Sequence, residues 1–257
     1  MKKFWGFLLV IVLMTSCGEY QSLLKSNDYN LVYKKAIEYY NKGDYQRAMN
    51  LLDGVRSVFV GQAKAQNIAY YRAFCSYNMK DYQIASDLFK QFIQTYPESS
   101  FAEECLYMMG FCDYKASPKP RLDQQVTEKA IREFQLYLSR YPYSMRKDKV
   151  NTYMDEMRDK LSYKAYLSAK NYYLREHYKA AVISLQNCLK DYPGSKYREE
   201  IMYMLFVSKY QMAVNSVEDK KVERYNNARE EYYYFADEYP NSRYAADVKK
   251  MYEDIEA

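Results

Sequence analysis

The chain has 257 residues, of which 49% are apolar and 28% charged, and its formal net charge is +5. This is enough apolar sequence for a core, and no basic run of the kind that binds nucleic acid is present. Seven glycines and six prolines are few for this length, which favours an all-helical chain. The 33 tyrosines are unusual, and helix propensity does not explain them.

The first segment, residues 1–16, has the pattern of a signal peptide. Lys2 and Lys3 are followed by eleven apolar residues, Phe4 to Met14, which are too few to span a bilayer. The next residues are small and end in Cys17, which resembles the bacterial lipoprotein signal, although Leu usually stands where this chain has Met14. The resemblance implies cleavage before Cys17, a covalent lipid such as palmitate on that cysteine, and a mature net charge of about +3.

Gly18, and not aspartate, follows the cysteine. By resemblance to lipoprotein sorting rules, this implies an outer-membrane protein that is lipid-anchored and faces the periplasm. An ordinary secretory signal with an incidental Cys17 is the alternative.

The remainder of the chain repeats one unit of two short helices. In the first helix a small residue lies between two tyrosines that are seven residues apart, and Tyr33 to Tyr70, Tyr70 to Tyr107 and Tyr166 to Tyr203 are each 37 residues. The copies are Tyr33/Ala36/Tyr40, Tyr70/Ala73/Tyr77, Tyr107/Gly110/Tyr114 and Tyr166/Ala169/Tyr173, with Tyr203/Phe206/Tyr210 as a fifth that lacks the small residue. In the second helix an alanine precedes a proline by twelve residues, at Ala85/Pro97, Ala130/Pro142, Ala181/Pro193 and Ala228/Pro240.

This pattern resembles the tetratricopeptide repeat, in which the small residues lie where two helices pack closest. The resemblance implies an all-α fold, a right-handed α-solenoid of about five helix pairs plus a C-terminal capping helix. We expect a lipidated tether over 17–28, repeats one to three over 29–142, and repeats four and five with the cap over 143–257. A serine two residues after each Tyr-Pro is expected to cap the next helix.

Three departures from the repeat are expected to be visible in the structure. Pro118 and Pro120 interrupt unit three and predict a protruding loop. Fourteen extra residues before Tyr166 contain no helix breaker, so they predict that the first helix of unit four is about four turns longer. Unit five contains a ten-residue insertion near Ser216, and 244–256 is the expected capping helix.

Nothing in the sequence indicates an enzyme, a metal site or a cofactor other than the lipid on Cys17. His177 is the only histidine and lies in a predicted turn. Metal sites of the HExxH type and catalytic triads that need a second histidine as ligand or relay are therefore excluded. The acidic pairs, such as Glu103-Glu104, are interpreted as solvated helix faces. We expect the other cysteines to be small buried residues without a required disulfide, namely Cys75, Cys105, Cys112 and Cys188.

The tyrosines beside the small residues are the candidate binding site. In tetratricopeptide repeats the first helix of each pair lines the concave surface, where aromatic rings and hydroxyls can hold a peptide. The alternative is that the rings only pack between repeats while the hydroxyls reach water. The candidate peptide-binding residues are Tyr33, Tyr40, Tyr70, Tyr77, Tyr107 and Tyr114.

The whole pattern resembles the BamD family of outer-membrane lipoproteins, most specifically over AYLSAKNYYLREHYKAAVISLQNCLKDYPGS, residues 165–195. The resemblance implies a non-enzymatic scaffold of the β-barrel assembly machinery. Its C-terminal half, 143–257, would dock a BamA-type barrel subunit, other assembly lipoproteins would bind as well, and its N-terminal half would receive unfolded outer-membrane precursors. Family members place an arginine where this chain has Ser184, so no individual docking residue is carried over.

Two other classes remain open at this point. The chain fits a different periplasmic repeat lipoprotein that coordinates cell-envelope proteins. It fits less well a glycan-binding nutrient-uptake lipoprotein, because those proteins are usually about twice as long.

Overall fold

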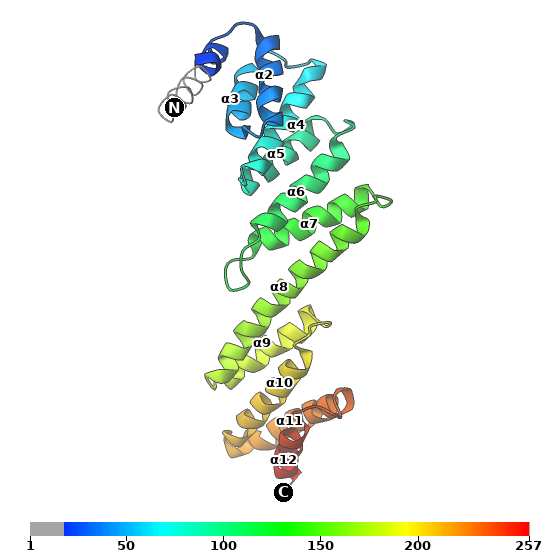
Figure 1. Ribbon diagram of the computed structural model, residues 1–257. Coiled ribbons are helices and arrows are strands. Elements are labelled where there is room, and N and C mark those ends of the chain that lie inside the picture. Colours follow the sequence, from blue (N-terminus) through cyan, green and yellow to red (C-terminus); the bar gives the residue numbers. More distant parts are fainter. Residues whose placement is uncertain (1–17, 257) are drawn as a thin grey trace, which may run out of the picture. The chain divides into compact units, whose positions relative to one another are not determined.

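The computed structural model describes residues 18–256, so the predicted signal peptide and Cys17 lie outside the described part. All regular structure in the described part is helical, which confirms the predicted solenoid of five helix pairs and a final helix (Figure 1). The pairs are α2 (Tyr29–Asn41) with α3 (Tyr45–Val55), α4 (Ala63–Asn78) with α5 (Tyr82–Thr95), α6 (Ala102–Ala116) with α7 (Gln125–Arg140), α8 (Lys147–Leu174) with α9 (Tyr178–Asp191), and α10 (Arg198–Val214) with α11 (Glu218–Glu238), followed by α12 (Ala245–Glu256).

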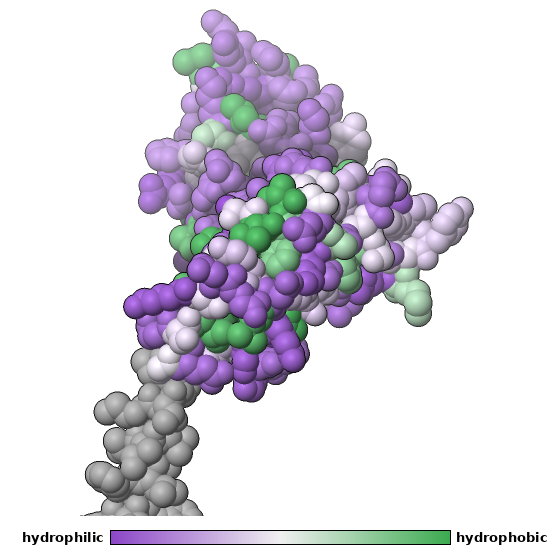
Figure 2. All heavy atoms as spheres, turned by 90° about the horizontal axis from the view of Figure 1, so that it is seen from above, coloured by the Kyte–Doolittle hydropathy of each residue, from purple (hydrophilic) through white to green (hydrophobic). Residues whose placement is uncertain are grey.

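The chain divides into two compact units, and the division falls within the long helix α8. Unit 1 contains the residues up to Pro118 together with Gln124–Met154, and unit 2 contains Lys119–Asp123 together with the residues from Asp155 on. From α2 to α7, and again from α9 to α12, each helix packs against the next one in the chain. The face drawn in Figure 2 is largely hydrophilic, with apolar side chains gathered in small patches.

The start of the chain is more ordered than the expected tether. Residues 18–24 are helical, and Tyr20 and Leu23 are buried against the core that α2 and α3 form. Asn50 donates a hydrogen bond to the Tyr20 hydroxyl at 3.0 Å. The segment therefore extends the core of the first repeat.

The small residues lie where the sequence pattern places them, at the closest approach of paired helices. The alanines of the pattern are fully buried, with 0% exposure at Ala73 and Ala85, for example. Gly110 has even less room, because a Cβ built on it would lie 2.9 Å from Cδ1 of the fully buried Phe134. A larger residue would force α6 away from α7.

The short turns between α2 and α3, α4 and α5, and α8 and α9 each contain a left-handed backbone position. Gly43, Lys80 and Glu176 occupy equivalent places there, with φ of 81°, 67° and 59°. Glycine adopts this conformation without strain, whereas lysine and glutamate adopt it at some cost.

The turn between pairs depends on the serine that follows Tyr-Pro. Ser144 lies before α8 and is not its N-cap residue, but its Oγ accepts the backbone N–H of Arg146 at 3.2 Å. The same contact, serine Oγ to the N–H two residues on, recurs at Ser99, Ser195 and Ser242. The serine therefore stabilises the turn that leads into the next helix.

The departures from the repeat are resolved as helices more than as loops. α8 has 28 residues, which confirms the predicted extension, and the insertion in unit five lengthens α11 to 21 residues. The proline-containing loop is more than a simple protrusion, because Lys164 donates a hydrogen bond to the Leu122 carbonyl at 2.8 Å. The final helix α12 is present as expected.

Two helical glycines provide a matched test of this packing. Gly110→Ala should lower the free energy of unfolding by about 1 kcal/mol, because the clash with Phe134 exceeds the gain in helix propensity. Gly54→Ala should raise it by about 0.5 kcal/mol, since nothing lies within 4 Å of its Cβ position. Denaturant titration of both variants measures the difference, and equal stabilisation of both would contradict the packing account.

Candidate peptide-binding face

The six candidate tyrosines lie on the first helices of the three pairs of unit 1, namely α2, α4 and α6. Two residues seven apart are separated by almost two helical turns, so the two tyrosines of a helix share one face with the small residue between them. Tyr107 is buried, with 8% exposure, and the other five are half-buried. The structure thus brings the candidates together on one face, which we call the tyrosine face.

Ring contacts link the helices across the tyrosine face. Tyr40 of α2 contacts Tyr71 of α4 with a centroid separation of 4.9 Å, and Tyr77 of α4 contacts Phe111 of α6 at 6.2 Å. Tyr114 then stacks on Tyr153 at 4.4 Å. Tyr153 lies on α8, and the sequence pattern did not identify it because it belongs to the inserted segment.

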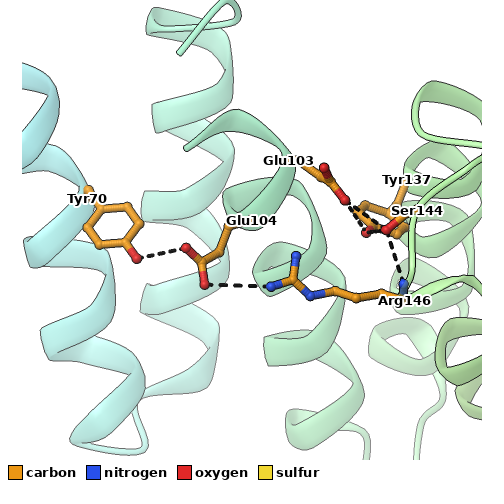
Figure 3. Close-up of polar contacts among 6 residues, drawn as sticks. All are labelled: Tyr70, Glu103, Glu104, Tyr137, Ser144 and Arg146. Atoms are coloured by element: carbon orange, nitrogen blue, oxygen red, sulfur yellow. Dashed lines mark hydrogen bonds and ion pairs between the residues drawn. The ribbon is translucent and has the colours of Figure 1, made fainter. Parts of the chain in front are cut away.

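The hydroxyl groups of these tyrosines divide into two kinds. Tyr70 donates a hydrogen bond to Glu104 Oε2 at 2.8 Å, and Arg146 lies 3.9 Å from the other carboxylate oxygen (Figure 3). Within the described residues, the hydroxyls of Tyr33 and Tyr77 make no hydrogen bond. Burial of the ring raises the pKa of Tyr40 to about 12, and burial together with Glu104 raises the pKa of Tyr70. The hydroxyls of Tyr40 and Tyr70 are therefore neutral at physiological pH.

The equivalent tyrosines of unit 2 are engaged in contacts of their own. Tyr166 is 5% exposed, and Lys170 joins its hydroxyl, at 2.8 Å, to Glu200, at 2.7 Å. Tyr203 stacks on Tyr244 with a centroid separation of 4.1 Å, and Tyr210 donates a hydrogen bond to Asp254 of α12. These hydroxyls are less available than those of Tyr33 and Tyr77.

The acidic pairs connect repeats, which corrects their interpretation as solvated faces. They do lie in the first turns of α6 and α10, as expected. Glu103, however, accepts hydrogen bonds from Ser144 at 2.8 Å and from Tyr137 at 3.0 Å (Figure 3). In unit 2 the equivalent Glu199 accepts one from Ser242 at 2.6 Å. At the starts of α6 and α10, the first glutamate of the acidic pair thus binds the serine in the turn that follows α7 or α11.

A buried polar cluster between α5, α6 and α7 was not predicted. Asp113 is 1% exposed and contacts Lys129 Nζ at 2.9 Å and Ser86 Oγ at 3.0 Å. Glu133 is 8% exposed, and its Oε2 has no hydrogen-bond partner among the described residues. Burial, a hydrogen bond to Asp113 and that residue's negative charge raise the pKa of Glu133 to about 8. The available signal was Asp113 itself, a charge within the apolar sequence of α6.

The cysteines of the described part, Cys75, Cys105, Cys112 and Cys188, are buried and free, as the sequence indicated. Burial raises the pKa of Cys75 and Cys105 to about 12, so these thiols are unreactive. His177 is an exposed turn residue at the start of α9. Residues 18–256 contain no cluster of three or more metal-ligating side chains, and none of their helices has the length and apolar character needed to cross a membrane.

Comparison with known proteins identifies the family. The family model described as YfiO: Outer membrane lipoprotein matches residues 25–200 and, in a second alignment, 164–257. The chain therefore belongs to this family of outer membrane lipoproteins. No curated protein matches the chain.

Solved structures of helical repeat proteins are also similar to the chain. A TPR repeats protein from Bacteroides fragilis is 12% identical with a TM-score of 0.42, over 90% of this chain and 99% of that one. The TPR2AB domain of yeast Sti1, in complex with pHSP90, is 14% identical with a TM-score of 0.40, over 89% of this chain and 98% of that one. These similarities are too weak to inform the function.

The buried cluster leads to a pH-dependent prediction. Glu133 is neutral in both states below its unfolded pKa of about 4.5, and between that pH and about 8 only the unfolded chain releases the proton, so stability is lost as pH rises. Glu133→Gln removes this loss, so the variant should be equally stable at pH 4 and more stable by about 2 kcal/mol at pH 8. Denaturant titrations across this pH range measure it.

Glu128→Gln is the control, since Glu128 lies on the same helix but is exposed, and its ion pair with Arg132 is long, at 4.0 Å. Its stability difference from the wild type should change little with pH. A pH-independent difference for Glu133→Gln would show that Glu133 is charged in the folded protein.

Proposed function

We propose that the protein is a non-enzymatic BamD-type scaffold of the outer-membrane β-barrel assembly machinery, anchored by lipid on Cys17 and facing the periplasm. Membership of the outer membrane lipoprotein family and the architecture of helix pairs support the class of scaffold. The observation that carries the proposal furthest is the tyrosine face, where ring contacts fix the aromatic side chains and the hydroxyls of Tyr33 and Tyr77 have no hydrogen-bond partner among residues 18–256.

Unit 1 is the proposed receiver of unfolded barrel precursors. A precursor strand has unpaired backbone N–H and C=O groups and alternating apolar side chains. Fixed rings offer contact area at low entropic cost, and neutral tyrosine hydroxyls hydrogen-bond with both kinds of backbone group. Tyr33 and Tyr77, whose hydroxyls have no partner in the described fold, are the first candidates for these bonds.

Unit 2 is the proposed docking region for the BamA-type barrel subunit and companion lipoproteins. A groove of about 660 Å³ between the start of α9 and the end of α10 is lined by Tyr178, Ile183 and Met212, among others. Ile183 is 56% exposed and lies next to Ser184, so the groove presents an apolar side chain to a partner. Docking here would bury it.

The second candidate function is a scaffold for other cell-envelope proteins, which the same fold allows. The sequence similarity of residues 165–195 to the BamD family favours the barrel-assembly proposal over this one. A glycan-binding role has less support, since tyrosine rings of unit 1 already contact other aromatic rings of the protein, as Tyr40 does Tyr71 and Tyr114 does Tyr153.

Removing hydroxyls without removing rings tests the receiving face. Tyr33→Phe combined with Tyr77→Phe should weaken the binding of synthetic peptides from barrel strands by about 3- to 30-fold, while the melting temperature stays unchanged, since each lost hydrogen bond contributes about 1 kcal/mol. Fluorescence anisotropy of labelled peptides measures the affinity.

Tyr70→Phe is the matched control, because its hydroxyl already binds Glu104. It should lower the free energy of unfolding by about 1 kcal/mol and leave peptide affinity unchanged. Unchanged affinity in the Tyr33/Tyr77 double variant would show that the face only packs the repeats together.

A further inference from the structure

The turn between α7 and α8 in unit 1 presents two large apolar side chains entirely to solvent. Tyr143 is 98% exposed and Met145 is 102% exposed, whereas no other large apolar side chain of the described residues exceeds 75%. The two residues flank Ser144 in the turn that joins the helices (Figure 1). Single exposed apolar side chains are common on protein surfaces, but here two stand together at one projecting turn.

The three other turns that follow a Tyr-Pro pair have polar residues or glycine at the same two positions. The residues in the place of Tyr143 are Glu98, Gly194 and Asn241. The residues in the place of Met145 are Ser100, Lys196 and Arg243. All four turns are held by the same contact of the serine Oγ with a backbone N–H. The turn therefore does not need apolar side chains for its own geometry.

The charge of this turn is also opposite to that of its equivalents. Residues 140–149 contain four cations and one acid, a net charge of +3. The equivalent segments 95–104, 191–200 and 238–247 have net charges of −3, −1 and −1. The turn between α7 and α8 is thus the only one of the four that is both apolar at its tip and basic.

The reversal of charge does not benefit the helix that follows. Lys149 lies in the first turn of α8, where the first turns of α6, α10 and α12 place Glu104, Glu200 and Asp247. A negative charge stabilises the N-terminus of a helix, and a positive charge there opposes the helix dipole. The lysine therefore needs an explanation outside the helix.

Two of the four cations are held by the protein, and two are not. Arg140 donates a hydrogen bond to a backbone carbonyl of the turn between α5 and α6 at 3.0 Å, and Arg146 lies 3.9 Å from a carboxylate oxygen of Glu104. Lys147 and Lys149 are exposed, and neither has an ion pair among residues 18–256. Two apolar side chains and two unpaired ammonium groups thus lie within seven residues of each other.

We propose that the turn between α7 and α8 rests on an anionic lipid membrane, with Tyr143 and Met145 entering the headgroup region and Lys147 and Lys149 contacting lipid phosphates. Tyrosine is suited to the interface between lipid and water, because its ring is apolar and its hydroxyl is polar. Lysines near an anionic surface are attracted to it. A projecting tip fits a lipid surface better than a protein interface, which buries about 800 Å² on each partner.

This contact would determine how unit 1 faces the membrane. The turn belongs to the same compact unit as the helix at residues 18–24, which directly follows the proposed lipid site Cys17 in the sequence. A basic patch strengthens the membrane binding that an acyl anchor provides, and it restricts the orientations that the anchor alone allows. The inference does not rest on the barrel-assembly role.

Fluorescence of the mature full-length protein in phosphatidylcholine vesicles, with or without phosphatidylglycerol, tests the proposal. Met145→Cys carries a nitrobenzoxadiazole dye, and Cys75, Cys105, Cys112 and Cys188 are buried, so the wild type gives the labelling background. Phosphatidylglycerol should shift the emission of the dye to the blue and allow its quenching by lipids with a nitroxide on the acyl chain. Asn241→Cys, labelled at the equivalent turn of unit 2, should show neither effect.

Removal of the two unpaired lysines tests the charge. Lys147→Gln combined with Lys149→Gln should lower the ratio of membrane-bound to free turn by about 10- to 30-fold. Lys220→Gln combined with Lys250→Gln removes the same charge from exposed positions of unit 2 and should change little. The melting temperatures of all variants should equal that of the wild type, since the altered side chains are exposed.

Three results would overturn the proposal. The first is emission and quenching at position 145 that do not depend on phosphatidylglycerol, and the second is quenching no greater than at position 241. The third is a dye that is shielded in native outer membranes but not in vesicles, which would indicate a protein partner for the turn.

Discussion

The fold depends on the close approach of two helices at small side chains. Ala73 and Ala85 are completely buried, and at Gly110 there is no room even for a Cβ. Since the small residue marks the contact with the partner helix, the side chains three before and four after it lie at the edges of that contact. Tyrosine suits such an edge, because its ring covers the apolar seam while its hydroxyl reaches outward. The tyrosine face therefore follows from the packing, and a binding role would use what the packing already provides.

Specific polar contacts hold each repeat to the next. The serine after Tyr-Pro organises the turn, and its hydroxyl donates a hydrogen bond to the first glutamate of an acidic pair at the start of the first helix of the preceding helix pair. Ser144 binds Glu103 in this way, and Ser242 binds Glu199. Because the same contact recurs in both units, it is a feature of the repeat and not of one site. It gives the acidic pairs at the starts of α6 and α10 a structural role.

Most of the fold was predictable from the sequence, because small residues, Tyr-Pro and the absence of breakers are local signals. They located the helix pairs, the extension of α8 and the final helix. The helix at residues 18–24 was missed, since a polar segment with two apolar residues does not reveal what it packs on. Tyr153 was missed because it belongs to the inserted segment, and the Asp113 cluster was missed because its residues come from different helices that only the folded chain brings together.

The two units place different chemistry on one scaffold. Among the described residues, the hydroxyls of Tyr33 and Tyr77 in unit 1 have no hydrogen-bond partner, whereas in unit 2 those of Tyr166 and Tyr210 bind Lys170 and Asp254. This difference fits a division of labour between precursor binding and docking. Affinity purification of the tagged full-length protein from detergent-solubilised outer membranes, with mass spectrometry, tests the central claim most directly. The account predicts stoichiometric recovery of a BamA-type barrel protein, and recovery of cell-wall enzymes or a sugar transporter in its place would contradict it.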